Sequence, residues 1–227
     1  MVPVLLALGG WQLQRAQDKA RLLEQFEARR QAQPLAIRDL NQLADVAYQP
    51  VRLSGFFDQT HSVLLDNRTR EGRPGVELLQ PFFDEPSEQW VLINRGWLPW
   101  PDRRQMPVFS TPEGQVRLSG WVYRPAESAV TLIQTQNSIG WPRVTSNADA
   151  PGLWRELDRP GVSFEVRMRP GPGSYQVDWP IVAMSPQKHQ GYAVQWFALA
   201  AALIALFVYF GVHNARESRD EHSRSPA

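Results

Sequence analysis

The feature that most limits how this chain can fold is a long uncharged stretch near its C-terminus. Gly191–Val212 contains no Asp, Glu, Lys or Arg. A helix of about 20 apolar residues is long enough to cross the hydrocarbon core of a bilayer. Tyr192 and Trp196 lie at one end and Tyr209 at the other, as in the aromatic belts of membrane helices. The stretch predicts a transmembrane helix, with a buried helix of a soluble protein as the alternative.

A second apolar segment, Met1–Leu13, is too short to span a membrane by itself. At 1.5 Å per residue it extends about 18 Å. It has neither the basic start nor the small-residue cleavage site of a signal peptide. We expect it to be the C-terminal part of a first transmembrane helix whose beginning is missing. The helical pattern continues as a stalk to about Gln33, where Pro34 ends it.

Basic residues near the C-terminal segment predict its orientation. Arg216, Arg219 and Arg224 follow the segment, whereas Lys188 is the basic residue just before it. The positive-inside rule then places the tail in the cytoplasm and the main domain on the outer side. The expected organisation is a helix end and stalk over 1–33, a β-rich domain over 34–188, a transmembrane helix over 189–213 and a disordered cytoplasmic tail over 214–227.

Between Tyr48 and Pro186 the hydrophobic pattern changes to a period of two, which is typical of β-strands. Short helices are expected over Ile37–Val46 and Asn147–Leu157. The predicted fold is an α+β membrane protein, with an antiparallel, barrel- or sandwich-like β-domain flanked by two transmembrane helices, the first truncated. The expected strands are Tyr48–Asp58, His61–Thr69, Val76–Asp84, Gln89–Trp100, Gln115–Arg124, Ser138–Val144, Val162–Pro170 and Gln176–Ser185.

The pentapeptide VRLSG occurs twice, at Val51–Gly55 and at Val116–Gly120. An aromatic residue follows each copy. We interpret the two copies as similar strands, each with a glycine at a bulge or at a close approach of two backbones.

Composition argues against several classes of function. The chain has no cysteine, which excludes disulfides, zinc–thiolate sites, iron–sulfur clusters and thiol catalysis. It has 24 Lys and Arg against 23 Asp and Glu, so no basic field predicts a nucleic-acid partner. No nucleophile elbow, phosphate loop, metal-site pair or dinucleotide fingerprint is present, so no enzyme is predicted. Copper delivery is also disfavoured, because His and Met are scattered.

The start of the C-terminal helix is a candidate site. His189, Tyr192 and Trp196 share one helical face. An imidazole there is able to act as an axial ligand to haem iron, with the ring system stacked on the aromatic residues. The alternative is an interfacial aromatic belt with a polar histidine at the level of the lipid headgroups.

A second dense cluster, Asn94, Arg95, Gly96 and Trp97, follows an apolar strand. In a structural interpretation, Gly96 permits a bulge or turn and Arg95 pairs with a carboxylate. In a functional interpretation, an exposed Arg–Trp cluster at a strand end binds a partner protein or a propionate group.

Taken in order, these motifs resemble the Surfeit locus protein 1 family of cytochrome c oxidase assembly factors. The resemblance rests on GGWQLQRAQDK, YQPVRLSGFF, LLDNRTREGRPGVELLQPF, VLINRGWLP and KHQGYAVQWFALA. It implies a two-span inner-membrane protein with its β-domain on the periplasmic side. It also implies that His189 is the candidate haem ligand. The family's Gly-Trp-Gln-x-x-Arg motif falls on Gly10, Trp11, Gln12 and Arg15, and its Asn-Arg-Gly-Trp motif on Asn94 to Trp97.

The resemblance implies a non-enzymatic role in maturing subunit I of a haem–copper oxidase, with haem a as transient cargo. We expect membrane lipids, subunit I and haem A synthase as partners. The alternative is a membrane-anchored scaffold that binds oxidase intermediates and no cofactor. The expected cofactor-binding residues are His189, Tyr192, Trp196, Trp11 and Arg15, and the expected partner-binding residues are Asn94, Arg95, Gly96 and Trp97.

Overall fold

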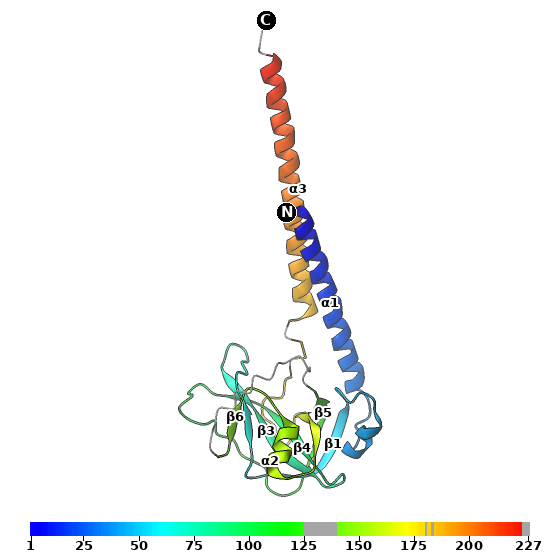
Figure 1. Cartoon of the computed structure of the whole chain (residues 1–227), viewed down its shortest axis with the longest axis vertical. Helices are drawn as coiled ribbons and strands as arrows, with labels where there is room; N and C mark the ends of the chain where they lie inside the picture. The colour runs from blue at the N-terminus through cyan, green and yellow to red at the C-terminus, as the bar shows by residue number, and fades with distance from the viewer. Residues whose placement is uncertain (125–139, 180, 183, 224–227) are drawn as a thin grey trace. The chain divides into compact units, whose positions relative to one another are not determined.

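The fold is described by a computed structural model that covers residues 1–124, 140–179, 181–182 and 184–223 of the 227-residue chain (Figure 1). The chain divides into two compact units. One unit consists of Met1–Gln25 and Pro180–Ala227, and the other of Phe26–Trp179. The β-rich unit is taken first, because it contains all the named strands.

Phe26–Trp179 is built around a closed β-barrel of five strands, counted over the described residues. β1 pairs with both β5 and β3, and this double pairing closes the sheet on itself. Beyond β3 the sheet continues through two short strands, β2 and β6. The strands are β1 (Pro50–Phe57), β2 (Val63–Leu65), β3 (Gly75–Asp84), β4 (Gln89–Pro99), β5 (Val116–Tyr123), β6 (Arg143–Thr145) and β7 (Gly161–Met168).

The expectation of a purely antiparallel sheet is wrong in two pairings. β7 runs parallel to β4, and β6 runs parallel to β2. β7 lies between β4 and β5, and it pairs antiparallel with β5. β4 and β5 therefore run in opposite directions, so any strand inserted between them has to be parallel to one of the two. The connection to β7 passes through the short helix α2 (Ala150–Leu157), which packs against β7.

Alternate side chains of the barrel strands fill its interior. In β1 the inward positions are Val51, Leu53 and Phe57, all at most 3% exposed. Each such side chain contributes about 1.5–3 kcal/mol on burial. A 3-10 helix, η1 (Ile37–Gln42), adds two more fully buried residues. The cluster consists of Ile37, Leu40, Val46, Val51, Leu53, Phe57, Phe82, Val91, Ile93, Leu118, Val122, Phe164, Val166 and Met168.

The two VRLSG copies are neighbouring strands, and both glycines lie where backbones approach closely, as expected. β1 and β5 pair antiparallel, with Val51 opposite Gly120 and Gly55 opposite Val116. A Cβ at Gly55 would lie 1.8 Å from the backbone oxygen of Phe83. A Cβ at Gly120 would lie 2.5 Å from the backbone oxygen of Arg167. The repeated glycine therefore lets β1 and β5 each approach a second neighbour.

Replacing Gly55 by alanine is expected to destabilise the barrel by about 3 kcal/mol, because β1 has to move away from β3 where the barrel closes. The measurement is chemical unfolding of the full chain in detergent, followed by tryptophan fluorescence. Gly171→Ala is the matched control, because its added Cβ would lie 3.9 Å from the backbone oxygen of Arg169, an ordinary contact distance. Equal unfolding midpoints for Gly55→Ala and the control would contradict the steric argument.

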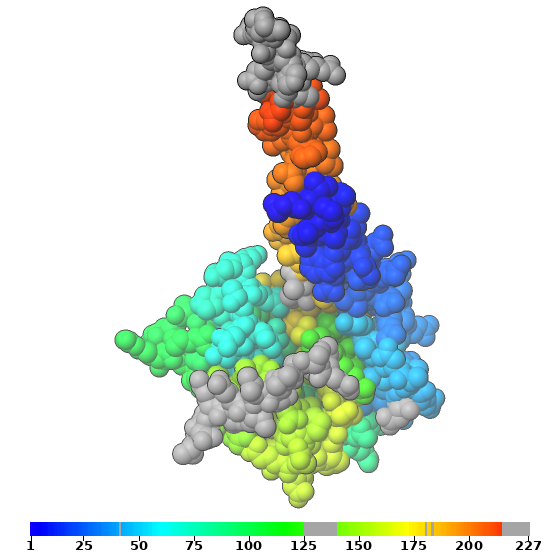
Figure 2. All heavy atoms as spheres, turned by 45° about the horizontal axis from the view of Figure 1, so that its top comes forward, coloured from blue at the N-terminus to red at the C-terminus, as the bar shows by residue number. Residues whose placement is uncertain are grey.

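The other unit contains α3 (Pro186–Ser223) and most of α1 (Val2–Arg30). Within the described residues, one helical segment is long and apolar enough to cross a membrane: Pro186–Asn214, with a mean hydropathy of 2.1. The second half of this segment, orange to red in Figure 2, has exposed apolar side chains, and Phe207 is 82% exposed. α1 does not meet the same criterion in the described chain, so a first membrane crossing stays a prediction.

The C-terminal turn of α1 belongs to the barrel unit. Phe26 packs edge-on against Tyr48 and Trp121, with ring centres 5.4 and 5.3 Å apart. Arg29 donates to Asp45 Oδ2 at 2.8 Å and to the backbone oxygen of Ala47. These contacts fix the end of α1 to the segment that leads into β1.

Most expected elements are present, with one clear error. Gln176–Ser185 was expected as a strand, but its described residues form only an isolated bridge between Gln176 and Trp97. Pro180 lies within this range and has no N–H to donate to a sheet. The expected helix near Asn147–Leu157 is confirmed as α2. The expected strand Ser138–Val144 lies partly outside the described residues and overlaps β6 at its end.

Candidate functional site

Helix α3 carries His189 in its first turn. The helix begins at Pro186, and proline suits a first helical position because the N–H it lacks would be unpaired there. Ser185 Oγ accepts a 3.4 Å hydrogen bond from the Lys188 N–H, in the manner of a helix N-cap. The local sequence therefore fixes where α3 begins, and with it the direction in which the His189 side chain leaves the helix.

A stripe of buried and half-buried residues runs along α1, and a second one runs along α3. The two stripes together are here called the seam. Its members recur every three or four residues, which is typical of two helices packed along their length. In Figure 1, α1 lies beside the first half of α3. The seam includes Val2, Leu5, Gly9, Gln12, Ala16, Lys19 and Leu23 of α1, and His189, Ala193, Trp196, Ala200 and Leu203 of α3.

Small residues bring the two helices close at the seam. A Cβ placed at Gly9 would lie 2.5 Å from Cε1 of Phe197. Ala16, Ala193 and Ala200 are at most 3% exposed. Because these side chains are short, polar side chains of the two helices can meet between them.

His189 is held in the seam by a side chain of α1. The residue is 8% exposed, and its Nδ1 lies 2.7 Å from Gln12 Oε1. A neutral imidazole binds a metal through one of its two nitrogens. Since Nδ1 is occupied by Gln12, Nε2 is the nitrogen that remains for a ligand.

The other predicted cofactor-binding residues are more exposed than His189. Trp11 is 52% exposed, and the guanidinium carbon of Arg15 lies 6.0 Å from the centre of its ring. Tyr192 is 45% exposed, and Trp196 is half-buried. The structure thus brings Trp11 and Arg15 together, and it places Trp196 in the seam with His189, whereas Tyr192 is exposed.

The Asn-Arg-Gly-Trp cluster of β4 is buried, so the expectation of an exposed cluster is wrong. Asn94 and Arg95 are 0% exposed and Trp97 is 3% exposed. Gly96 has a φ of 111°, and a Cβ there would lie 2.7 Å from the backbone oxygen of Gln176. Glycine is therefore required by the backbone, as the structural interpretation holds. Burial argues against direct contact between these four residues and a partner protein.

Arg95 is buried without the carboxylate partner that the structural interpretation assumed. Its Nε donates to the backbone oxygen of Gly173 at 2.7 Å, and its Nη2 to that of Ser110 at 2.7 Å. Its Nη1 donates to Gln80 Oε1. Burial lowers the pKa of Arg95, but a guanidinium stays protonated in proteins. Neutral oxygens thus solvate this buried cation.

A second buried polar group spans three strands and was missed by sequence reasoning. Asn94 Nδ2 donates to Glu77 Oε2 at 2.9 Å, and Arg167 Nε donates to Glu165 Oε1 at 3.2 Å. Burial raises the pKa of Glu165 and outweighs the opposing effect of Arg167. In the sequence, Glu165 and Arg167 alternate with apolar residues, which predicts an outward face but not its burial.

Asp58 organises a third polar cluster. It accepts hydrogen bonds from Thr60 N at 2.7 Å and from Arg159 Nη1, and its Oδ2 lies 2.7 Å from His61 Nδ1. Burial alone would raise the pKa of Asp58, but these hydrogen bonds outweigh it and hold the pKa well below its usual range. The His61 ring packs edge-on against Trp141, 4.7 Å between centres. The cluster therefore ties the end of β1 to the loops around it.

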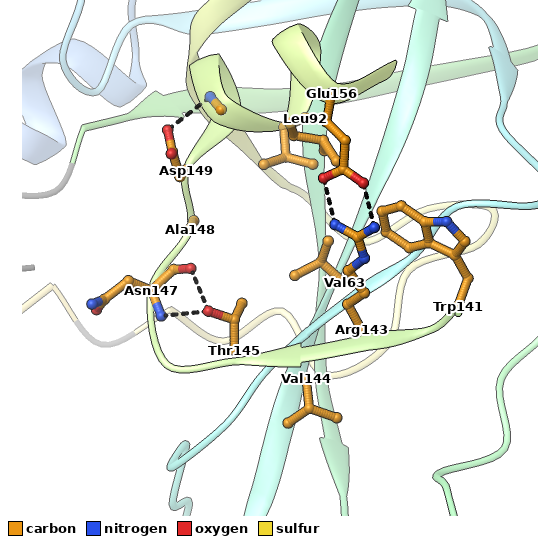
Figure 3. Close-up of a pocket in the computed structure, with 12 residues that line it drawn as sticks. Val63, Leu92, Trp141, Arg143, Val144, Thr145, Asn147, Ala148, Asp149 and Glu156 are labelled. Atoms are coloured by element: carbon orange, nitrogen blue, oxygen red, sulfur yellow. Dashed lines mark hydrogen bonds and ion pairs between the residues drawn. The ribbon is translucent and has the colours of Figure 1, made fainter. Parts of the chain in front are cut away.

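Trp141 also lines a pocket between β6 and α2 (Figure 3). Arg143 stacks over the Trp141 ring at 4.2 Å and pairs through both terminal nitrogens with Glu156. The cavity volume is about 270 Å³, which is at the small end for drug-sized ligands. This pocket is too small to enclose a porphyrin, so it is not a candidate site for haem.

No group of three His, Asp or Glu side chains that could hold a metal ion occurs in the described part of the chain. Haem iron does not require such a group, because the porphyrin supplies four nitrogen ligands and the protein adds an axial one. His189 is therefore a sufficient protein ligand in type and number for that chemistry.

These observations define the class of protein: a small β-barrel attached to a helix that is apolar enough to cross a membrane, with a buried histidine at the start of that helix. The chain belongs to the SURF1 family, which it matches over residues 1–201. The family expected from the motifs is thereby confirmed.

Several relatives match most of the chain. The Surfeit locus protein 1 of Xenopus tropicalis is 27% identical over 233 residues, covering 91% of this chain and 72% of that protein. The human Surfeit locus protein 1 is 28% identical, covering 89% and 72%. The cytochrome oxidase assembly protein SHY1 of Saccharomyces cerevisiae is 25% identical, covering 66% of this chain and 38% of that protein.

Proposed function

We propose that this protein is an inner-membrane assembly factor for a haem–copper (cytochrome c) oxidase. In this role it holds haem a transiently as cargo and assists its insertion into subunit I. Membership of the SURF1 family supports a role in oxidase assembly, and so does the name of the yeast relative, a cytochrome oxidase assembly protein. The proposed action is non-enzymatic, with subunit I, haem A synthase and membrane lipids as partners.

The observation that carries the haem proposal is the geometry of His189. The residue lies at the start of the apolar helix, and Gln12 engages its Nδ1. An imidazole fixed in this way has Nε2 as its free ligand atom. Tyr192 and Trp196 follow on the same helix and offer aromatic surface for a planar, apolar ligand. Trp11 and Arg15 add an aromatic ring and a cation, and a cation suits a propionate.

We further propose that the protein crosses the membrane twice, with the barrel on the periplasmic side. The apolar surface of α3 supports one crossing. The start of α1 would be the end of the other crossing. The basic residues that follow the apolar segment of α3, including Arg216 and Arg219, support a cytoplasmic tail.

A second candidate function is a scaffold that binds oxidase intermediates without holding a cofactor. The loop between β4 and β5 favours it, because Met106 is 46% exposed and Val108 is 93% exposed. Exposed apolar side chains on a proline-rich loop suit contact with another protein. The two candidates differ in what the oxidase lacks when the protein is missing.

Deleting the gene for this protein is expected to lower both the haem a content of subunit I and the oxidase activity of the membranes, and a plasmid copy is expected to restore both. The measurements are reduced-minus-oxidised visible spectra and the rate of cytochrome c oxidation. A normal haem a content per subunit I, with less assembled oxidase, would favour the scaffold instead. Unchanged spectra and activity would contradict both candidates.

A further inference from the structure

Gln12 is the polar residue of α1 that meets His189 across the seam. Along α1, Gln12 lies one helical turn after Gly9 and one turn before Ala16, and all three belong to the seam. Because Gly9 and Ala16 are small, the long Gln12 side chain has space to reach α3. Its Oε1 lies 2.7 Å from His189 Nδ1, a distance typical of a strong hydrogen bond.

The chemistry of the two groups decides which of them donates. An amide oxygen is only an acceptor, so His189 Nδ1 has to carry the proton. In a neutral imidazole the other nitrogen then has no proton and keeps its lone pair. The contact with Gln12 therefore selects the tautomer in which Nε2 is ready to bind a metal.

The surroundings make this selection effective. His189 is 8% exposed, so water competes weakly for Nδ1. In the described part of the chain, the buried side-chain nitrogens without a partner belong to Arg70 and Arg143. His189 Nε2 is not among these atoms.

We propose that Gln12 is a positioning residue for the haem site: it fixes the Nδ1–H tautomer and the ring orientation of His189, so that Nε2 faces the iron. This inference rests on the proposed function, and it assigns Gln12 a role through His189 and no direct contact with haem. Partners of this kind typically change metal affinity by about 10- to 100-fold.

The first arm of the test needs no haem. The full chain, labelled with ¹⁵N-histidine in detergent at about pH 8, is compared with Gln12→Leu by ¹⁵N–¹H spectroscopy of the imidazole rings. The signal of His189 is identified by its loss in His189→Gln. We expect the Nδ1–H tautomer in the wild type and a shift toward Nε2–H in Gln12→Leu. An Nε2–H tautomer in the wild type would overturn the inference, because the amide would then be donating its own N–H.

The second arm measures haem. Gln12→Leu is expected to weaken haem a binding about 10-fold or more and to change the visible spectrum of what remains bound. Gln12→Glu keeps an acceptor at the same place, so this variant is expected to bind haem a as the wild type does. Gln14→Leu is the matched control, because Gln14 is exposed on the same helix. Haem binding unchanged in Gln12→Leu, despite an altered tautomer, would overturn the positioning role.

The two arms separate this inference from the proposed function. If the wild type binds no haem a while Gln12→Leu still changes the tautomer, the proposed function fails and the selection of the tautomer stands. If the wild type binds haem a through His189 while Gln12→Leu changes neither the tautomer nor the affinity, the inference about Gln12 fails and the proposed function stands.

Discussion

Replacing His189 by leucine is expected to abolish co-purification of haem a with this protein. Leucine has about the volume of the imidazole but no nitrogen, so the iron loses its protein ligand while the seam stays packed. The variant and the wild type would be purified in detergent from membranes that contain haem a. Their visible spectra and extracted haem would then be compared at equal protein concentration. We expect a loss of at least about 10-fold.

The control for this prediction is Gln195→Leu. Gln195 is exposed and lies on the same helix, between Tyr192 and Trp196 in the sequence. The variant therefore tests a nearby change of polarity that leaves the imidazole in place. Haem content equal to the wild type is expected for Gln195→Leu. Equal haem content in His189→Leu would rule out His189 as the ligand, provided that the thermal unfolding of the two variants is the same.

The second large effect is expected in the barrel, where Arg95→Met should destabilise the protein by roughly 3 kcal/mol or more. Methionine keeps the apolar stem but removes the donors to the buried Gln80 Oε1 and to the half-buried backbone oxygen of Gly173, and each buried group left unpaired costs about 1–3 kcal/mol. The stacking of the guanidinium between Phe57 and Tyr175, at 4.9 and 5.3 Å from the ring centres, is also lost. The measurement is chemical unfolding in detergent, followed by circular dichroism.

Arg104→Met is the matched control for Arg95→Met. Arg104 is exposed on the loop that follows β4, and exposed substitutions away from buried networks usually change stability by less than about 0.5 kcal/mol. A midpoint of unfolding for Arg95→Met that equals that of the control would contradict the structural role of the network.

The sequence predicted the elements of the barrel better than their pairing. Period-two patterns such as those of β1 and β5 identify strands, because alternate side chains face opposite sides of a sheet. Strand direction depends on which neighbours a strand inserts between, and that information is not local. The parallel pairing of β7 with β4 follows from its position beside β5, which no single strand pattern reveals.

The misreading of Asn94 to Trp97 has a similar cause. A polar Asn-Arg pair after an apolar run is typical of a strand that has reached the surface. In β4, however, the chain continues between β3 and β7, and the polar groups are paired inside by Glu77, Gln80 and backbone oxygens. Burial of an arginine depends on partners that are distant in sequence, so the residue types alone could not reveal it.

The surroundings of His189 were predicted in part. Helical spacing placed His189 on one face with Tyr192 and Trp196 of the same helix, and the family resemblance made it the candidate ligand. The partner that the structure gives it, Gln12, is 177 positions away. A signal was present, because Val2, Leu5, Gly9, Gln12 and Ala16 follow the three-and-four spacing of a packed helix. Reading that spacing as a contact surface would have placed Gln12 toward the other helix.

The filled interior of the barrel has a consequence for any cargo. Val51, Phe82, Ile93 and Val166 are 0% exposed and occupy the centre, so a porphyrin cannot be enclosed there as it would be in a hollow carrier. A hydrophobic ligand would have to be carried on the outside of the protein, where lipid and the receiving subunit are within reach. Release would then require only that the ligand leave His189 and the outer surface of this protein for the receiving subunit. The barrel would not have to open.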